Sequence, residues 1–308
     1  MKDFKNFGLK RRVFPECNYN AIWYDLKTIR LGEGKASALP PAESEFYDVG
    51  INTKCNAECP FCYVSASGKG VNYPNICETW KKWMDTFWEK QEHKVLVTNK
   101  PFQIAIGSTG EPTIHPEFCD FLKTVYESGV VPNYTTNGIT LASHTPLAEK
   151  IMEATRKYVG GVAVSFGNKA LRDYARTAVN NLINLGNTNV NIHHIISDKN
   201  SVDEFIAEWL RYGDKILYHV LLPLMPSGRS DHGIEAGVWE YLEEMIQKHD
   251  IKNVAFGAHF IKYLRDSKIK TWLYDEESFS KNIILTPNKV QITPSSFDLN
   301  PIEVIELW

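Results

Sequence analysis

Three cysteines with the spacing C-x3-C-x2-C stand in the stretch Cys55-Asn56-Ala57-Glu58-Cys59-Pro60-Phe61-Cys62. The chain has six cysteines in 308 residues, so half of them fall in this one stretch. The residues just before it, 45–52, alternate in polarity and then become apolar, which predicts a strand that ends shortly before Cys55. We therefore expect the three cysteines on a loop at the C-terminal end of a strand.

Three thiolates in one loop suit some metal centres better than others. A structural zinc site is closed by four ligands, whereas three cysteines are enough for a four-iron, four-sulfur (4Fe-4S) cluster with one iron left open. A partial zinc site and buried free thiols remain as alternatives. A disulfide framework is not expected, because a chain of this length builds its core without cross-links and we recognise no signal peptide. Cys17 is expected to be a free thiol, and Cys77 a structural one.

A second motif follows the next predicted strand, residues 102–107. It reads Ser108-Thr109-Gly110-Glu111-Pro112-Thr113 and precedes a predicted helix over 116–128. A simple turn before a helix explains the glycine and the proline. It gives no reason for the acidic side chain of Glu111, so we treat the segment as a candidate for ligand binding.

Together the two motifs resemble the signature of the radical S-adenosylmethionine (radical SAM) enzymes, in which the open iron of one 4Fe-4S cluster binds S-adenosylmethionine. The resemblance implies that Cys55, Cys59 and Cys62 ligate this cluster. It also implies that the cofactor site is shaped by Phe61, Gly110, Glu111, Asn137 and Ser165. The family's Gly-Gly-Glu-Pro segment has a glycine where this chain has Thr109, a departure that would narrow the cofactor slot.

Predicted strands and helices alternate six times between residues 46 and 248, as is typical of parallel strands joined by right-handed helical crossovers. Six units are too few for a closed eight-stranded barrel, so we predict an α/β fold built on a partial (β/α)6 barrel. The predicted strands cover residues 45–52, 102–107, 131–136, 162–167, 190–196 and 216–222. The predicted helices cover residues 76–92, 116–128, 146–158, 170–185 and 201–212. The cofactor-site candidates lie at or just after strand ends, where chemistry gathers in such folds.

The N-terminal segment, residues 1–45, is expected to form an arm that covers an edge of the barrel. Residues 20–26 favour a strand, and residues 37–43 favour an extended linker because they contain two adjacent prolines. The partial barrel then spans residues 46–250. Within it, the stretch 65–75, rich in glycine and serine, is expected to form a mobile loop over the site.

After residue 250 the pattern changes. We predict a small α+β extension over 251–308 that covers the site, with a strand over 254–260. A hairpin is expected around the turn Thr286-Pro287-Asn288-Lys289. No cysteine follows Cys119, so the tail has no ligands for a second cluster, and a single cluster is expected in the chain.

Composition excludes some classes of partner. The chain carries 34 lysines and arginines against 37 aspartates and glutamates, a formal net charge of -3. Binding nucleic acid by counterion release usually needs a basic face, which this balance does not suggest. No apolar run approaches the roughly 20 residues that span a bilayer. We therefore expect a cytoplasmic protein with no nucleic-acid or membrane partner. The resemblance adds an electron donor such as flavodoxin or ferredoxin.

Several further residues are weaker candidates. Arg172 and Arg176 could reach the carboxylate of the cofactor from a predicted helix, although a solvated position is the simpler expectation for each. His193 and His194 are adjacent in a strand, so their side chains must point to opposite faces. Candidate acid-base groups are His193, His194, His219, His259 and Arg229, and the catalytic residues stay unassigned. The run Pro226-Ser227-Gly228-Arg229 resembles the Pro-x-Gly-Arg segment of radical SAM enzymes that carry C-terminal extensions.

The resemblance implies a reaction class. Such an enzyme cleaves S-adenosylmethionine reductively to a 5'-deoxyadenosyl radical, which then removes hydrogen from a substrate. The expected substrate is a small polar molecule, such as a nucleobase or an amino-acid derivative, that undergoes a lyase reaction or a rearrangement. One alternative is the modification of a ribosomally made peptide, although residues 1–45 show no evident peptide-binding domain. The other is a non-enzymatic iron-sulfur or zinc protein.

Overall fold

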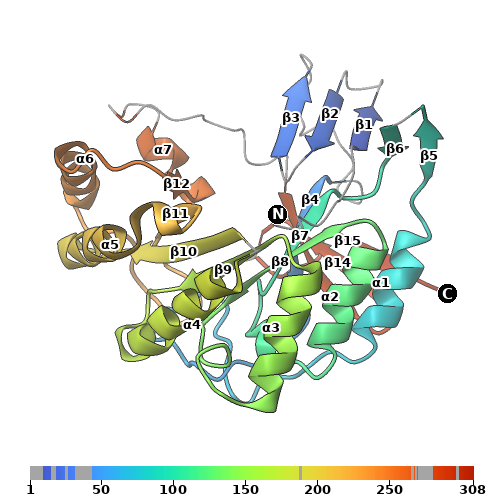
Figure 1. Ribbon diagram of the computed structural model, residues 1–308, viewed down its shortest axis with the longest axis horizontal. Coiled ribbons are helices and arrows are strands. Elements are labelled where there is room, and N and C mark those ends of the chain that lie inside the picture. The colour runs from blue at the N-terminus through green and yellow to red at the C-terminus, as the bar shows by residue number, and fades with distance from the viewer. Residues whose placement is uncertain are drawn as a thin grey trace.

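The computed structural model describes residues 10–14, 19–24, 27–31, 44–93, 95–186, 189–264, 267, 269, 280–295 and 298–308. Within these ranges the strands form one sheet of ten and one of five (Figure 1). The order in the larger sheet is β12-β11-β10-β9-β8-β7-β4-β13-β14-β15. Neighbours from β12 to β13 run parallel, and β14 and β15 are antiparallel additions.

The parallel part contains the six predicted strands. They are β4 (Phe46–Gly50), β7 (Gln103–Ile106), β8 (Val131–Thr136), β9 (Gly161–Ser165), β10 (Asn189–Ile196) and β11 (Tyr218–Pro223). Two more parallel strands flank them, β12 (Val254–Phe256) beside β11 and β13 (Ser280–Thr286) beside β4. The expected α/β fold with a large parallel sheet is confirmed. In the part of the chain that the structure describes, β12 does not pair with β15, so the sheet stays open.

Helices pack on one face of this sheet, as the alternating burial of the strands shows. In β10 every second residue from Val190 to Ile196 is buried, and the residues between them are half-buried. We call the less buried face the inner face. The main helices are α1 (Ile76–Met84), α2 (Phe118–Glu127), α3 (Pro146–Tyr158), α4 (Arg172–Leu185), α5 (Lys199–Tyr212) and α6 (Val238–Lys248), with the short α7 (Ile261–Leu264) after β12. Local signals start two of them: Thr145 caps α3 ahead of a proline, and Asp198 and Ser201 form a capping box on α5.

Helix α1 is shorter than predicted. We expected it to run over 76–92, but it ends at Met84, and β5 (Glu89–Glu92) follows it. The apolar period misleads because Phe87, beyond the helix, still packs against Trp83 with ring centroids 5.4 Å apart. Periodic contact with the core therefore continues for one turn after the helical backbone has ended.

That an N-terminal arm covers an edge of the barrel stays a prediction, but the described strands of this segment take part in the five-stranded sheet. Its order is β3 (Lys27–Leu31), β2 (Tyr19–Tyr24), β1 (Lys10–Phe14), β6 (Val95–Thr98) and β5. Because β6 leads into β7 and the Lys10 ammonium donates to the Gly129 carbonyl just before β8, this sheet lies at the N-terminal ends of the parallel strands. Figure 1 shows it at the top of the view. The strand near 20–26 is thus confirmed, whereas Cys17 and the linker over 37–43 lie outside the described residues.

The predicted C-terminal hairpin is present, formed by β13 and β14 (Lys289–Thr293). Its position in the main sheet was not predicted. Strand β13 pairs with β4, and β15 (Glu303–Glu306) pairs with β14, so all three strands extend the main sheet. The strand expected over 254–260 is only the short β12, followed by a 3-10 turn at Ala258–Phe260. That the tail covers the site stays a prediction.

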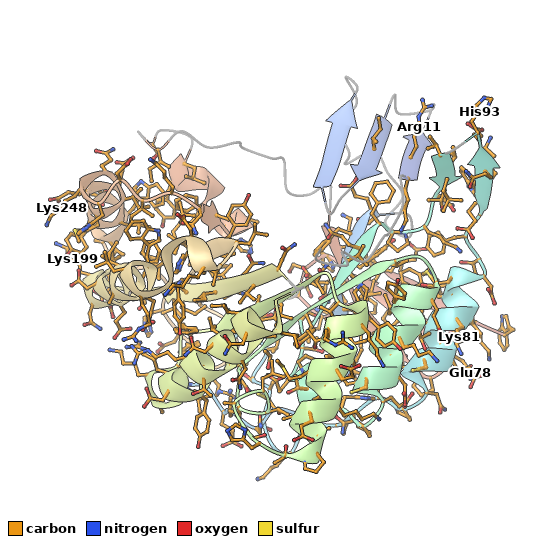
Figure 2. The ribbon with its side chains drawn as sticks, viewed as in Figure 1. Arg11, Glu78, Lys81, His93, Lys199 and Lys248 are labelled. Atoms are coloured by element: carbon orange, nitrogen blue, oxygen red, sulfur yellow. The ribbon has the colours of Figure 1, made fainter. Side chains whose placement is uncertain are left out.

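Charged side chains are spread around the periphery. Figure 2 shows outward-pointing side chains on the five-stranded sheet and on several helices, among them Arg11, Glu78, Lys81, His93, Lys199 and Lys248. Among the helices of the described ranges, none is both long and apolar enough to cross a membrane.

Candidate functional site

The cysteine loop, residues 51–73, is a closed excursion from the end of β4. The Cys55 amide donates to the Ser67 carbonyl at 2.9 Å, so the outgoing and returning chains are hydrogen-bonded. Gly70 permits this pairing, since a Cβ atom there would lie 2.2 Å from the Thr53 carbonyl oxygen. The expectation of a mobile loop over 65–75 is therefore corrected: much of that stretch is bonded to the chain that carries Cys55.

Cys55, Cys59 and Cys62 are free and half-buried on this loop. Burial raises the pKa of Cys55 and of Cys59, and the charge of Cys62 raises both further. Hydrogen bonds oppose this rise, from the Ala57 amide to Cys55 and from the Asn168 side chain to Cys59. Thiolates at Cys55 and Cys59 are thus unfavourable on their own, and a bound cationic centre would stabilise them.

Two asparagine side chains reach these sulfurs. Asn168 Nδ2 lies 3.3 Å from Cys59 Sγ, and Asn137 Nδ2 lies 3.9 Å from Cys55 Sγ. Asn137 was predicted, and Asn168 was missed. The signal was available, because Asn168 follows β9 much as Asn137 follows β8, and its Oδ1 accepts the Ala170 amide at 3.1 Å, which fixes the side chain.

The donor set fits an iron-sulfur cluster. Such clusters are held by cysteine thiolates, and hydrogen bonds to the sulfurs tune them, as the two asparagines would do. In the described ranges, no group of three or more His, Cys, Asp or Glu side chains converges as on a single metal ion. Each thiolate of a four-iron cluster binds a different iron, so the three sulfurs lie farther apart than the ligands of a single ion.

Glu111 is the centre of a saturated hydrogen-bond network. Its side chain is 3% exposed, and its carboxylate accepts from the Thr113 hydroxyl at 2.6 Å, the Thr113 amide at 3.2 Å, the Thr136 hydroxyl at 2.7 Å and the Asn137 amide at 2.7 Å. We call these four residues the Glu111 frame. Burial raises the pKa of Glu111, and these four bonds oppose the rise. The frame ties the end of β7 to the end of β8, and direct contact between Glu111 and the cofactor stays a prediction.

Gly110 and Thr109 join the second motif to the chain after β4. A Cβ atom on Gly110 would lie 2.6 Å from Asn52 Oδ1, so only glycine fits this close approach. The Thr109 hydroxyl donates to the Asn52 carbonyl at 2.6 Å. A Cβ atom on Gly50 would lie 2.4 Å from the Thr109 hydroxyl. Thr109 is 1% exposed, so its side chain fills the space beside Gly50 and not an open slot.

A partly open cavity of about 260 Å³ lies beside the cysteine loop. Phe61 lines it from the loop, Gly167 from the chain after β9, and Ile195 from β10. Phe61 packs closely there, since a Cβ atom on Gly167 would lie 2.9 Å from its ring. Among the predicted cofactor residues, Phe61 lines this cavity, while Ser165 ends β9 on the inner face next to His193.

Ion pairs between α4 and α5 form one wall of the cavity. Arg172 donates to Glu204 at 2.6 Å, and Lys169 lies 3.1 Å from the same carboxylate. The Nε atom of Arg172 is buried without a hydrogen-bond partner, and Arg172 lines the cavity. Arg176 instead donates to Glu208, which ties the two helices together. Arg172 is therefore the better placed of the two predicted arginines.

The histidines divide as expected for adjacent strand positions. His193 is half-buried on the inner face, and burial lowers its pKa to about 4. His194 points to the helix side, where its Nε2 lies 3.0 Å from Nδ1 of His219. Burial lowers the pKa of His219 to about 4 as well.

The two other acid-base candidates lie elsewhere. His259 is exposed in the turn after β12, and the Arg229 guanidinium donates to the Cys59 carbonyl at 2.7 Å.

Asp48 was missed by sequence reasoning. It lies in β4 between Tyr47 and Val49, which are fully buried in the core under α1, so its side chain points to the inner face. Burial raises the pKa of Asp48 to about 7. The available signal was an acidic residue in the middle of an otherwise apolar strand.

Comparison with known proteins adds evidence on the fold. No protein-family model matches the chain, and neither does any curated protein. The crystal structure of Streptococcus suis SuiB bound to S-adenosylmethionine matches with a TM-score of 0.57 and 13% identity, over 82% of this chain and 60% of SuiB. This protein shares the fold of SuiB. SuiB bound to its precursor peptide SuiA matches with a TM-score of 0.58 and 15% identity, over 83% of this chain and again 60% of SuiB. The chain thus spans less than two thirds of the length of SuiB.

Proposed function

We propose that this protein is a radical SAM enzyme in which Cys55, Cys59 and Cys62 ligate one 4Fe-4S cluster that binds S-adenosylmethionine. The observation that carries the proposal is the set of three free thiols on the loop after β4, in a fold shared with a protein crystallised with S-adenosylmethionine. The bound groups would supply hydrogen abstraction by a 5'-deoxyadenosyl radical. Reducing electrons would come from a donor such as flavodoxin or ferredoxin.

The chain's own residues would bind and orient these groups. Phe61, Gly110, Glu111, Asn137 and Ser165 are the proposed cofactor contacts. The Glu111 frame fixes the backbone of Asn137, whose side chain reaches Cys55. Phe61 forms one wall of the cavity and would exclude water from the reacting atoms.

For the substrate we propose a small polar molecule, such as a nucleobase or an amino-acid derivative, in a lyase reaction or rearrangement. The inner face supports this class, because its half-buried side chains are mostly small or polar. They include Asp48, Ala105, Asn133, Thr135, Ser165, Asn191 and His193. Asn133 and Asn191 already have protein partners, and a polar substrate would supply hydrogen-bond partners to Asp48 and His193, as buried polar atoms require.

Peptide modification is the second candidate. It is favoured by the likeness to SuiB, which was crystallised with a precursor peptide, and by the Pro-x-Gly-Arg segment. The two candidates can be separated by asking whether small-metabolite or peptide fractions stimulate the formation of 5'-deoxyadenosine by the reconstituted protein.

Anaerobic reconstitution with iron and sulfide tests the cluster. We expect about four irons per chain and visible absorbance in the wild-type protein, and loss of both in Cys59→Ala. Cys77→Ala is the matched control, because Cys77 lies in α1 outside the cysteine loop. Full cluster loading of Cys59→Ala, or about eight irons in the wild type, would contradict the proposal.

A further inference from the structure

The segment 227–229, which follows β11, is hydrogen-bonded to the cysteine loop. The Arg229 amide donates to the Cys62 carbonyl at 3.0 Å, and the Ser227 hydroxyl donates to the Tyr63 carbonyl at 3.1 Å. Between them, Gly228 has a φ of +64°, and a Cβ atom there would lie 2.2 Å from the Cys62 carbonyl oxygen. Only glycine allows both the left-handed backbone and this close approach. The contact between this segment and the cysteine loop therefore depends on the glycine at position 228.

The Arg229 guanidinium bridges the two sides of the same loop. Its Nε donates to the Cys59 carbonyl at 2.7 Å, and its Nη1 donates to the Ala66 carbonyl at 2.9 Å. With the hydrogen bond from its backbone amide to Cys62, Arg229 binds three carbonyls of the loop, those of Cys59, Cys62 and Ala66. A guanidinium suits this role because its donors are fixed in a planar fork, whereas a lysine ammonium is a single point charge.

The positive charge of Arg229 also lies close to the proposed ligands. Its guanidinium donates to the backbone carbonyl of Cys59, the residue that carries one of the three thiols. The Asn168 side chain donates to the Cys59 sulfur at 3.3 Å. Charge and hydrogen bonds near the sulfurs are among the factors that set the reduction potential of an iron-sulfur cluster.

We propose that Arg229 is a positioning residue that holds the cysteine loop in its ligating shape and raises the reduction potential of the bound cluster. This inference rests on the proposed function, since it needs a cluster on the three cysteines. The direction follows from electrostatics: reduction adds a negative charge to the cluster, and a nearby guanidinium stabilises that charge. Removing the guanidinium makes the cluster harder to reduce.

Two substitutions separate the two roles. Arg229→Gln removes the charge, and Arg229→Lys keeps the charge but cannot bridge both carbonyls. Arg156→Gln is the matched control, because it removes the same charge from the exposed end of α3, where Arg156 pairs with Glu153. All three variants are reconstituted with iron and sulfide, and their cluster potentials are measured by redox titration followed by electron paramagnetic resonance.

We expect Arg229→Gln to lower the equilibrium constant for cluster reduction about threefold, which is about 28 mV for a one-electron couple. Arg229→Lys should keep most of the wild-type potential, and Arg156→Gln all of it. Hydrogen exchange of the cluster-free proteins provides the second readout. Amides of residues 55–67 should exchange faster in both Arg229 variants than in the wild type, and at the wild-type rate in Arg156→Gln.

Each outcome decides one part of the inference. A wild-type potential in Arg229→Gln overturns the electrostatic role, and wild-type exchange in both Arg229 variants overturns the role in holding the loop. If Arg229→Gln does not fold, Arg229→Lys still tests the hold on the loop through exchange. A wild-type protein that takes up no cluster contradicts the proposed function instead, and the exchange experiment on the cluster-free chain remains valid.

Discussion

The Glu111 frame and the inner face of the sheet treat buried carboxylates in opposite ways. Glu111 is 3% exposed and its carboxylate accepts four hydrogen bonds from the protein. Asp48 is half-buried on the inner face, and its carboxylate accepts no hydrogen bond from the described residues. Burial accordingly raises the pKa of Asp48 to about 7. The folded chain supplies the hydrogen-bond donors of the Glu111 carboxylate, whereas the Asp48 carboxylate would take its donors from a bound ligand.

The same contrast extends to the cavity beside the cysteine loop. Arg172 lines it with a buried, unpartnered Nε atom, and His193 on the inner face is kept neutral at neutral pH because burial lowers its pKa to about 4. Buried polar groups are normally satisfied, so unsatisfied ones near a cavity indicate where a ligand would bind. In the proposed function the Glu111 frame would hold the site together, and the inner face and the cavity would form its binding surface.

Breaking the frame should have the largest effect on stability. Glu111→Ala removes the acceptor of four hydrogen bonds, three of them buried, and we expect it to lower the free energy of unfolding by about 3 to 5 kcal/mol. The measurement is urea denaturation of the cluster-free protein. Glu149→Ala, at an exposed position in α3, is the control and should cost less than about 0.5 kcal/mol. Equal stabilities of the two variants would show that the four bonds are not important to the fold.

Removing the unsatisfied carboxylate should have the opposite sign. The pKa of Asp48 is raised from 3.8 to about 7 in the folded protein, so the folded state holds this proton more tightly than the unfolded state does. Its contribution to stability is full below about pH 4 and is lost as the pH rises through 7. Relative to the wild type, Asp48→Asn should thus gain about 2 to 4 kcal/mol between pH 4 and pH 8.

Denaturation at a series of pH values measures this difference. Asp173→Asn is the matched control, because that side chain is 96% exposed and should show no such gain. If the stabilities of Asp48→Asn and the wild type run parallel from pH 4 to pH 8, Asp48 does not carry the buried, raised pKa that the contrast requires.

The contact between Gly50 and Thr109 can be tested by overpacking and rescue. In Gly50→Ala the new methyl group would meet the Thr109 hydroxyl at 2.4 Å, and the buried threonine has little room to move, so we expect a loss of about 2 kcal/mol. Thr109→Gly in the same chain should restore most of it, because it removes the group that clashes. Additive losses in the double-mutant cycle would mean that the two positions do not contact each other.

Arg172 should matter least for stability and more for binding. Arg172→Met should lower the free energy of unfolding by at most about 1 kcal/mol. One donor of Arg172 is already unpaired, and Glu204 still has its ion pair with Lys169 at 3.1 Å. If the cavity takes part of the cofactor, S-adenosylmethionine should bind the reconstituted variant about tenfold more weakly, about 1.4 kcal/mol. Calorimetric titration of the cofactor measures this, and unchanged affinity would remove Arg172 from the binding surface.

The regular part of the fold could be predicted because its signals are local. Apolar strands and amphipathic helices alternate along the chain, and α3 was predicted at its observed bounds, Pro146–Tyr158. The five-stranded sheet could not be predicted in this way. It pairs β1 with β6, for example Lys10 with Leu96, and no local pattern reports a contact between such distant segments.

The candidate site divides along the same line. The three cysteines and Glu111 could be found because each lies in a short motif. The hydrogen bonds from Thr136 and Asn137 to Glu111 could not, since these two residues belong to the next strand and its end and meet Glu111 only in the folded chain. Asp48 was missed because its importance depends on which face of β4 it occupies, and strand alternation alone does not tell inside from outside.

Assay of 5'-deoxyadenosine tests the central claim most directly. The reconstituted protein is incubated anaerobically with S-adenosylmethionine and a strong reductant, and the product is quantified beside Cys59→Ala and Cys77→Ala. The account predicts 5'-deoxyadenosine from the wild type and from Cys77→Ala, and none from Cys59→Ala. Equal product with and without the cluster would contradict it, as would a loaded wild-type cluster that neither binds nor cleaves S-adenosylmethionine.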